Sequence, residues 1–459
     1  MRTLIPLVVF LLILYLPRSA VAESTACTPD VEATSDLGVV EEAFNLLTLL
    51  YVDRLPPGQL LNPAADAVRE KLEPEASGET GVERASSLAN TPVATWAAFA
   101  GEYCALWTAA PNEMEPDALA HTAIRAMVRA VDEGHTRFLT RQMYEDHQAW
   151  ANGDMRYDGI GARLRSSPLT IQYVFPESPA ANAGLAYGDQ IIAIDGVPAA
   201  DLPASDAVLL MRGETGSSVR LTIQRPETDG QWDVDVARAK VSIPLVETRM
   251  IGDVAYMRIQ GFPTTDLPDT VQSDLRAFEA ADAKALVLDL RGNSGGRIDV
   301  GSEIASYFLP NESPIYRQTS RRGQTTTAMS GNDRIWSKPI VALIDDGTAS
   351  MGEIMAASLQ EEGVAMLLGS QTAGSVAGSV VVPLSDGAAL QVTTLRIDSG
   401  LGTPLNGVGV SPDVSVESPP GETADAQDVV LSRALEQLHA QLGDLSRSRD
   451  FAAPDQRPQ

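Results

Sequence analysis

The sequence predicts a multi-domain α/β protein, in which a helical N-terminal region is followed by a β-rich domain and then by a core of alternating strands and helices. The chain has 459 residues, which suits about three domains of ~150 residues each. Apolar residues recur at helical spacing before residue 150, and strand-like runs begin only after residue 155. Hydrophobic residues make up 44% of the chain and aromatic residues 5%, so we expect sizeable cores that are mainly aliphatic.

The N-terminus has the three parts of a secretory signal peptide, assigned to residues 1–22. Arg2 precedes an apolar run at residues 4–16, and Ala20-Val21-Ala22 supplies a cleavage site of small residues. The run is shorter than the ~20 residues that span a membrane. We therefore expect export to the periplasm or the extracellular space with cleavage after Ala22, whereas an uncleaved signal would hold the protein at the membrane.

The chain has two cysteines, Cys27 and Cys104. In an oxidising compartment they could form one disulfide, and two inert thiols are the alternative. There is no C-x-x-C run and no cluster of histidine with cysteine. We therefore expect no metal site and no cofactor.

Residues 31–150 are predicted to be helical because apolar residues at 39–51 and 118–131 follow the helical period, with a polar loop at 73–93 between them. In contrast, residues 155–227 consist of short β-like runs broken by Gly, Pro and Asp. These runs are residues 170–175, 190–194 and 218–224.

Residues 240–420 alternate strand-like and helical runs, which is typical of an α/β layer domain. The strand-like runs are residues 254–259, 285–290 and 339–344, and the helical ones are 270–281 and 354–361. The C-terminal segment, residues 421–459, is predicted to hold an amphipathic helix at 427–442. We expect the polar tail after Gly443 to be disordered.

The charge balance excludes one class of partner. The chain carries 61 acidic and 34 basic residues, a net charge of −27, which argues against binding nucleic acid. Only four of the basic residues are lysines, and any mechanism that needs a lysine must use one of them. They are Lys71, Lys240, Lys284 and Lys338.

The middle segment resembles a PDZ domain over residues 155–227. The resemblance rests on Gly159-Ile160-Gly161-Ala162 and on the runs SPAANAGL at 178–185 and GDQIIAIDG at 188–196. Gly159 and Gly161 can turn consecutive backbone N–H groups toward the carboxylate of a peptide C-terminus, and a free strand edge can add the peptide as a strand. Ile160, Ala162 and Leu164 would face that groove, so protein or peptide partners with apolar C-termini are expected. A plain glycine-rich hairpin is the alternative.

Three segments of the last domain indicate acyl-transfer chemistry. The apolar strand before Asp289 runs into the turn Arg291-Gly292-Asn293-Ser294-Gly295-Gly296, which would expose backbone N–H groups. A second strand leads to Ser350 at the start of a helix, where the positive helix end and the next N–H favour a nucleophile. Taken alone, Ser350 is better explained as a helix cap than as a nucleophile. The third segment comprises residues 369–375 and is considered together with the downstream run at 404–413.

Together these segments resemble the carboxyl-terminal processing, or tail-specific, serine proteases over residues 40–418. These proteases have the same order of segments, with an export signal, a helical part, a PDZ domain and then the core. Their N-terminal part is matched here by YVDRLPPGQLL at 51–61 and DEGHTRFLT at 132–140. The resemblance implies a crotonase/ClpP-like α/β protease core at 240–420 and an endopeptidase with Ser350 as nucleophile. Gly295 or Gly296, with the Met351 N–H, would form the oxyanion hole.

The sequence departs from this family at the general base. Most members use a lysine in a T-x-G-K-G run downstream of the serine. The matching run here is Thr372-Ala373-Gly374-Ser375-Val376, so Ser375 occupies the position of the base, and no lysine follows Lys338. The usual Ser/Lys dyad is therefore absent.

Three interpretations of this departure remain open. In the first, His135 is the base. The EGHT run at 133–136 resembles the tricorn-type branch of the superfamily, which uses a Ser–His pair. Asn406 would then orient the imidazole. His135 could also be structural. In the second, the protein is an inactive homologue that binds peptides or serves as a scaffold. In the third, Ser375 relays a proton to water or to Glu353.

Overall fold

The computed structural model describes residues 31–72, 95–107, 117–416 and 428–451, apart from single residues at 155, 167, 203, 227, 229, 243 and 332. The predicted signal peptide, Cys27 and the predicted loop at 73–93 lie outside the described residues. The chain divides into two compact units. The first unit holds the described residues up to Arg141 together with Val381–Val392, and the second holds Gln142–Val380 and the described residues from Thr393 onward. None of the described helices is long and apolar enough to cross a membrane.

The first unit is a group of helices around its own core. The helices are α1 (Val31–Leu50), α2 (Pro57–Leu72), α4 (Trp96–Trp107) and α5 (Ala118–Arg129). Cys104 is buried in this core and is disulfide-bonded, so the alternative of a free thiol is wrong for this residue.

A hairpin from much later in the chain completes the first unit. Strand β1 (Arg137–Leu139) pairs with the first residues of β18 (Ala389–Ser399), and Phe138 lies opposite Leu390. The turn between β17 (Ala377–Pro383) and β18 adds apolar side chains to the helical core. These are Leu384, Ala388, Leu390 and Val392. No local pattern in the sequence predicts this return of the chain.

The PDZ part of the second unit is a twisted sheet in the order β3-β4-β5-β7-β8, with β6 beside β5. The strands are β3 (Ala162–Ser166), β4 (Leu169–Val174), β5 (Gln190–Ile194), β6 (Val197–Pro198), β7 (Ser218–Gln224) and β8 (Trp232–Ala237). Helices α7 (Pro179–Asn182) and α8 (Ala204–Met211) complete the domain, and α6 (Arg141–Ala151) precedes it. A separate pair, β2 (Arg156–Gly159) and β9 (Ala239–Ser242), carries the chain into and out of the domain. Because β3 ends the order, one of its edges is unpaired within this sheet.

The predicted protease core is a sheet in the order β10-β11-β12-β15-β16-β19, parallel except for the first pair. The strands are β10 (Val246–Ile251), β11 (Val254–Ile259), β12 (Ala285–Asp289), β15 (Ile340–Ile344), β16 (Ala365–Gly369) and β19 (Val414–Ser415). A further pair, β13 (Pro314–Ser320) and β14 (Thr325–Met329), joins the end of β18.

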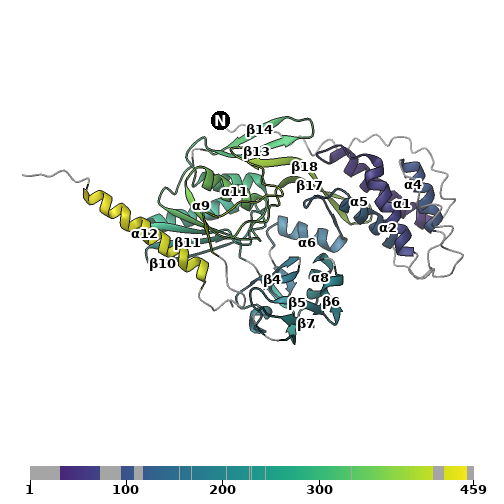
Figure 1. Ribbon diagram of the computed structural model, residues 1–459, viewed down its shortest axis with the longest axis horizontal. Helices are drawn as coiled ribbons and strands as arrows, with labels where there is room; N and C mark the ends of the chain where they lie inside the picture. Colours follow the sequence, from purple (N-terminus) through teal and green to yellow (C-terminus); the bar gives the residue numbers. More distant parts are fainter. Residues whose placement is uncertain are drawn as a thin grey trace, which may run out of the picture. The chain divides into compact units, whose positions relative to one another are not determined.

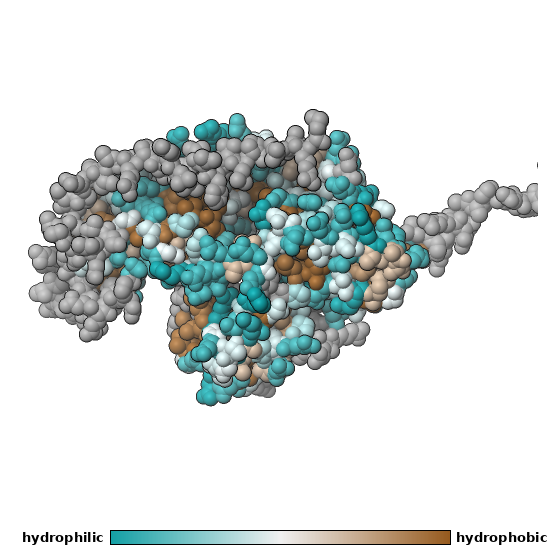
Figure 2. All heavy atoms as spheres, turned by 180° about the vertical axis from the view of Figure 1, so that it is seen from behind, coloured by the Kyte–Doolittle hydropathy of each residue, from teal (hydrophilic) through white to brown (hydrophobic). Residues whose placement is uncertain are grey.

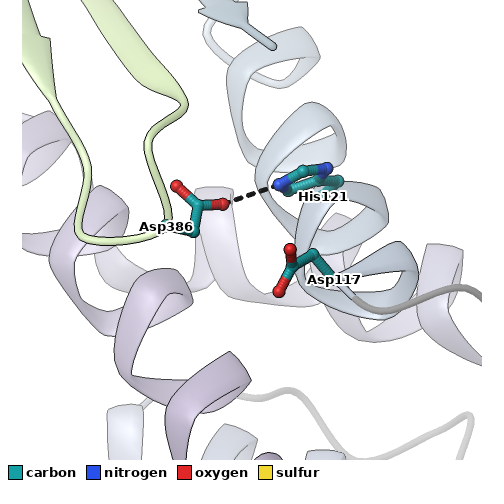
Figure 3. A group of neighbouring side chains, drawn as sticks. All are labelled: Asp117, His121 and Asp386. Atoms are coloured by element: carbon teal, nitrogen blue, oxygen red, sulfur yellow. Dashed lines mark hydrogen bonds and ion pairs between the residues drawn. The ribbon is translucent and has the colours of Figure 1, made fainter. Parts of the chain in front are cut away.

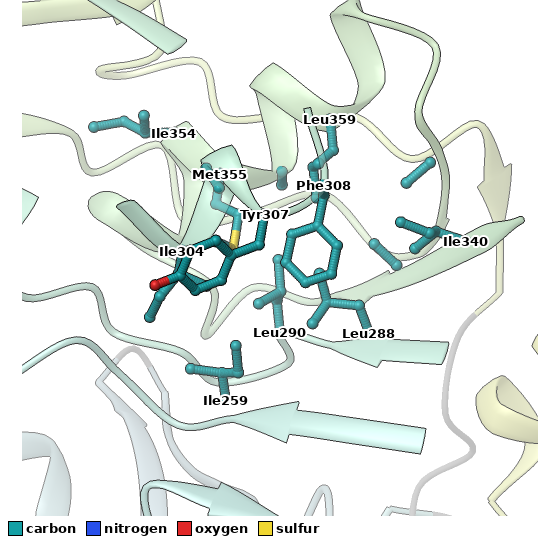
Figure 4. Close-up of a cluster of buried hydrophobic side chains, with 14 of the residues drawn as sticks. Ile259, Leu288, Leu290, Ile304, Tyr307, Phe308, Ile340, Ile354, Met355 and Leu359 are labelled. Atoms are coloured by element: carbon teal, nitrogen blue, oxygen red, sulfur yellow. The ribbon is translucent and has the colours of Figure 1, made fainter. Parts of the chain in front are cut away.

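Helices cover both faces of the core sheet (Figure 1). On one face lie α9 (Leu267–Ala280), α10 (Ile298–Ser306) and α11 (Met351–Glu361). Figure 4 shows the resulting cluster, which contains Leu288 of the sheet together with Phe308 and Met355. On the other face lies α12 (Val429–Phe451), which buries Val430 against the sheet. Strands buried on both faces are continuous apolar runs, which explains why the sequence shows them clearly.

The C-terminal tail corrects one expectation. We expected disorder after Gly443, but α12 continues to Phe451. The reason is that no proline or glycine lies between Gly443 and Pro454, so nothing in the sequence ends the helix earlier. Residues 452–459 lie outside the described part of the chain.

The molecular surface is mainly hydrophilic on the face that Figure 2 shows. Hydrophilic residues cover most of the described face seen in Figure 2, and apolar patches are scattered among them. The large hydrophobic side chains that remain exposed are spread over several elements rather than gathered on one helix. Such scattered exposure is ordinary for a folded protein and does not by itself mark a docking surface.

Candidate active site

Ser350 lies in the tight turn that joins β15 to α11, at the carboxyl edge of the parallel sheet. Its φ is 54°, a left-handed conformation that is rare and strained for a residue other than glycine. Its carbonyl oxygen accepts the first bond of the helix from Ile354 N at 3.0 Å. The side chain is half-exposed at the positive end of α11, which favours negative charge at that point.

The glycine-rich loop after β12 approaches the Ser350 turn closely. A Cβ atom on Gly295 would lie 2.6 Å from the Cβ of Ser350 and 2.9 Å from the N atom of Met351, so a larger residue would push the loop away. The Gly295 N–H already donates to Oδ1 of Asn293 at 2.9 Å. Within the described residues, the N–H groups of Gly296 and Met351 have no acceptor. Of the two glycines predicted for the oxyanion hole, Gly296 is therefore the one with an available donor.

Asn293 is a residue whose role the sequence did not reveal. Its side chain is fully buried, and Nδ2 donates to the carbonyl oxygen of Ile259 at 2.9 Å. Its own carbonyl oxygen accepts the N–H of Ala349, next to the nucleophile, at 2.8 Å. Asn293 thus ties β11, the glycine-rich loop and the Ser350 turn together. The signal that could have revealed this role was the position of Asn293 in the middle of the glycine-rich run at 291–296.

Asp289 and Arg291 form a buried charge pair just before the glycine-rich loop. Arg291 donates to Asp289 from Nε at 2.9 Å and from Nη2 at 2.6 Å. Burial alone would raise the pKa of Asp289, but the charges of Arg291 and Arg258 outweigh it and hold that pKa well below its usual range.

The guanidinium group of Arg291 also contacts Asp428, which lies at the start of α12. Nη1 and Nη2 of Arg291 donate to Asp428 at 3.1 and 2.7 Å. Asp428 also caps α12 by accepting the N–H of Leu431 at 2.8 Å. The start of α12 is therefore fastened to the residue that precedes the glycine-rich loop.

Glu353 joins the nucleophile turn to the segment that replaces the usual lysine. Its carboxylate is fully buried and accepts the N–H of Ser350 at 3.1 Å and of Ser375 at 2.9 Å. It also accepts the N–H of Gly374 at 2.8 Å and the hydroxyl of Thr372 at 2.5 Å. Both oxygens hold donors in place, which argues against the interpretation in which Glu353 accepts a proton from Ser375.

The structure brings the main chain of Ser375 directly against the nucleophile, because Ser350 N donates to the Ser375 carbonyl oxygen at 2.9 Å. Asn406 lies at the same segment, where its Oδ1 accepts the N–H of Val376 at 3.2 Å. Asn406 was expected to orient an imidazole. The contact that the structure records instead supports the loop that carries Ser375.

The lysines of the core lie at the other edge of the sheet. Lys284 and Lys338 precede β12 and β15, whereas Ser350 follows β15, and both strands run in the same direction. Lys338 donates from Nζ to the carbonyl oxygen of Ala283 at 2.7 Å, and Lys284 pairs with Asp282. Lys240 is exposed on β9, and Lys71 is exposed on α2 of the first unit. These positions agree with the predicted absence of a Ser/Lys dyad.

His135 belongs to the first unit, in the turn between α5 and β1. Its side chain is 11% exposed, and its Nδ1 lies 3.5 Å from Oε1 of Glu133. The same carboxylate accepts the N–H of His135 at 2.8 Å and the N–H of Thr136 at 2.9 Å. Glu133, to which the sequence pattern assigns no role, is thus the acidic group held beside the imidazole.

The predicted peptide-binding loop of the PDZ domain is partly as expected. Gly161 has a positive φ of 79°, and its carbonyl oxygen accepts the N–H of Phe175 at 3.0 Å. Gly159 ends β2, and Ala162 begins the edge strand β3. The expectation that Ile160 faces the groove is wrong: its side chain is 4% exposed and lies in the PDZ core, because the turn at Gly161 directs it inward.

Two PDZ side chains contact the loops of the site. Nη2 of Arg163, on β3, donates to Oε1 of Gln260 at 3.0 Å, and its guanidinium lies directly over Gly292. Burial and the neighbouring Arg258 lower the pKa of Arg163 to about 10. Gln172, on β4, donates to Asp346 at 2.8 Å. The PDZ domain therefore touches the turn that leads into the glycine-rich loop.

One group of side chains in the first unit has donor atoms close enough to hold a metal ion (Figure 3). Asp117 and His121 come from α5 and its start, and Asp386 comes from the turn between β17 and β18. Nε2 of His121 lies 2.7 Å from Oδ2 of Asp386, and Arg141 donates to the main-chain oxygen of Asp386. We interpret the pairing of His121 with Asp386 as a tie between α5 and the hairpin.

Comparisons with known proteins identify the family of this chain. The sequence model of the PDZ domain family matches residues 170–225. The sequence model of peptidase family S41 matches residues 253–416. The carboxyl-terminal-processing protease of a Picosynechococcus species is 32% identical over 309 residues, which are 66% of this chain and 74% of the relative. The carboxy-terminal-processing protease of Bartonella bacilliformis is 30% identical over 69% of this chain and 74% of its own length.

Among solved structures, the photosystem II D1 C-terminal processing protease superposes with a TM-score of 0.59 at 22% identity. The match covers 83% of this chain and 93% of that one, so the two share a fold. The chain thus belongs to the carboxyl-terminal processing serine proteases of peptidase family S41, with a PDZ domain ahead of its protease core.

Proposed function

We propose that this protein is an exported endopeptidase that binds the C-terminal tails of proteins through its PDZ domain and cleaves peptide bonds through an acyl-enzyme at Ser350. The observation that carries the proposal is the pair of N–H groups at Gly296 and Met351, which have no acceptor among the described residues. Met351 directly follows Ser350, and Gly296 follows Gly295, at which a Cβ would lie 2.6 Å from the Cβ of Ser350. Such donors, fixed in advance, stabilise the oxyanion of acyl transfer.

In the proposed reaction, Oγ of Ser350 attacks the carbonyl carbon of the scissile bond while its proton passes to His135. The negative charge that develops on the carbonyl oxygen is accepted by the N–H groups of Gly296 and Met351. The C–N bond then breaks, and His135 returns the proton to the leaving amine. A water molecule attacks the ester in the same way, releases the new C-terminus and restores Ser350.

Support for His135 as the base comes from its carboxylate neighbour. Glu133 lies 3.5 Å from Nδ1 of His135, and a carboxylate at that nitrogen would leave Nε2 as the proton acceptor. Asn406 contacts the Ser375 segment instead, so we assign the orienting role to Glu133. The missing lysine favours a second candidate function, an inactive homologue that binds tails without cutting them.

A serine-directed phosphonate distinguishes the two candidates. We expect the wild-type protein to be labelled at Ser350 and to cleave an unstructured protein, and Ser350→Ala to do neither. His135→Ala should lower the rate by ~10²-fold or more, as loss of a general base does, whereas His147→Ala on α6 should leave it unchanged. A wild-type protein that neither labels nor cleaves would establish the inactive homologue. Full activity in His135→Ala would remove His135 as the base.

Export can be tested apart from the chemistry. Sequencing the N-terminus of the protein recovered from the expressing cells should give Glu23 as the first residue, as cleavage after Ala22 requires. An intact Met1 in the membrane fraction would instead indicate an uncleaved anchor.

A further inference from the structure

A histidine and two carboxylates converge within the first unit (Figure 3). His121 lies on α5, Asp117 directly precedes this helix, and Asp386 lies in the turn between β17 and β18. One ligand atom from each side chain lies within 4.8 Å of the other two. Because Asp386 is 265 positions from His121, no local spacing in the sequence could indicate this group.

Two of the three side chains are held in place by their neighbours. The ring centre of His121 lies 4.8 Å from that of Phe138, which is buried. Oδ1 of Asp386 accepts the N–H of Ala388 at 2.9 Å, and Oδ2 lies 2.7 Å from Nε2 of His121. The Asp386 side chain is only 8% exposed. Neighbours of this kind orient the ligands of a metal site before the metal binds.

The carboxylate of Asp117 is not used by the described part of the protein. An aspartate at the N-cap of a helix normally accepts an N–H group of the first turn. Asp117 occupies this position on α5 but makes no such bond, and its side chain has no other hydrogen bond or ion pair among the described residues. A negative group next to the His121–Asp386 pair is therefore available to a ligand.

A buried hydroxyl within electrostatic range of Asp117 is also unsatisfied. Tyr103 is 1% exposed, and its hydroxyl has no hydrogen-bond partner among the described residues. Burial, with smaller contributions from the charges of Asp36 and Asp117, raises the pKa of Tyr103 above its usual range. Unsatisfied polar groups are rare inside proteins, and a bound water or ion is a common reason for them.

The charges around the turn favour a cation. Besides Asp117 and Asp386, the carboxylate of Glu42 lies there and accepts the N–H of Ser385 at 3.0 Å. The guanidinium of Arg141 donates to the main-chain oxygen of Asp386, so its recorded bond is not to one of these carboxylates.

We propose that Asp117, His121 and Asp386 bind one divalent transition-metal ion, for which Zn²⁺ suits the ligands best. An imidazole nitrogen favours Zn²⁺ over Mg²⁺ and Ca²⁺, which take oxygen ligands. Ligand atoms around a tetrahedral Zn²⁺ lie about 3.4 Å apart, and the separations here differ from this by at most about 1.5 Å. Water would be the fourth ligand.

Binding of the ion would change how α5 is tied to the turn. Nε2 of His121 must be free of its proton to bind the metal, so that proton passes to solvent and the direct bond to Asp386 is replaced by two bonds to the ion. The ligands come together only in the folded chain. The ion would therefore bind the folded first unit in preference to the unfolded one and stabilise it.

Calorimetric titration of the untagged, chelator-treated full-length protein with Zn²⁺ tests the proposal. We expect one ion per chain with micromolar affinity. Asp117→Asn should weaken binding by about tenfold or more, since loss of a ligand should cost at least as much as loss of a group that orients one. Asn tolerates the left-handed φ of 64° at this position, so the thermal midpoint of the metal-free variant should equal that of the wild type.

Bound Co²⁺ gives a second measurement, because its visible absorption depends on the number and type of its ligands. The wild-type protein should develop these bands and lose them when Zn²⁺ is added. His121→Gln should not develop them, although its amide can still donate to Asp386. Zn²⁺ should raise the thermal midpoint of the wild type but not that of Asp117→Asn.

Asp253→Asn is the matched control. It removes a carboxylate that lies 3.6 Å from Nε2 of another histidine, His439, and should leave the Zn²⁺ affinity unchanged. An equal loss of affinity in this control would show that the ion binds exposed histidine–carboxylate pairs in general, which overturns the inference. A wild-type protein that binds no Zn²⁺ overturns it as well, and so does an Asp117→Asn variant that binds the ion as tightly as the wild type.

Discussion

At the scale of single residues, Glu353 links the nucleophile to the segment at 372–375 through four donors. Glu353→Gln places an amide NH₂ against backbone N–H groups, so at least one buried donor loses its acceptor at a cost of ~1–3 kcal/mol. We expect a lower free energy of unfolding in urea and slower phosphonate labelling. Glu361→Gln on the same helix, whose carboxylate accepts from Ser399, should affect stability without slowing labelling. Equal labelling in both variants would contradict this role.

Ser375 offers a second test at this scale, because its main chain already lies 2.9 Å from the N atom of Ser350. Ser375→Lys supplies an amine where related enzymes keep their base. We expect this variant to restore labelling and cleavage in the His135→Ala background. An inert double variant would show that the site has lost more than its base.

The sequence predicted part of this site for a physical reason. Ser350, Gly296 and Ser375 belong to local runs whose residue types the chemistry dictates, so they can be read without a structure. Glu133 could not be found in this way, because its role depends on where a turn directs one carboxylate. Asn293 was visible in its motif, but its bond to Ile259 joins segments that only the folded chain brings together.

At the scale of secondary-structure elements, α12 holds the glycine-rich loop through the contact of Asp428 with Arg291. Asp428→Ser keeps a good helix cap but is too short to replace the carboxylate on Arg291. We expect the free energy of unfolding to change by less than ~1 kcal/mol, while kcat falls about tenfold at constant KM because an oxyanion donor is less well placed. Glu436→Ser, on an exposed face of the same helix, is the matched control. A KM that rises with kcat unchanged would refute this coupling.

The elements themselves differ in how far the sequence defines them. Strand β15 is buried on both faces, so its continuous apolar run predicts it directly. Strand β11 is also buried on both faces, but Arg258 interrupts its apolar run. The hairpin turn at 381–392 could not be assigned to the first unit from the sequence. Apolar residues such as Leu384 and Leu390 would suit the core of either unit, so their identity does not say which core they join.

At the scale of the whole molecule, the two units have separate hydrophobic cores. We expect calorimetry to resolve two unfolding transitions. Leu288→Ala, at a fully buried position of the second unit, should lower one transition by ~2–5 kcal/mol. Reduction of the disulfide at Cys104 should lower only the other, by ~2–4 kcal/mol. A single transition that responds to both changes would show that the units unfold as one.

The location of the core lysines has a practical consequence for handling the protein. Lys284 is exposed at the edge of the sheet opposite Ser350, and Lys338 is half-buried beside it. Amine-reactive dyes, cross-linkers and activated resins will therefore modify the protease core away from the nucleophile. A preparation coupled to a solid support through these amines should keep its serine open to reagents in the mobile phase.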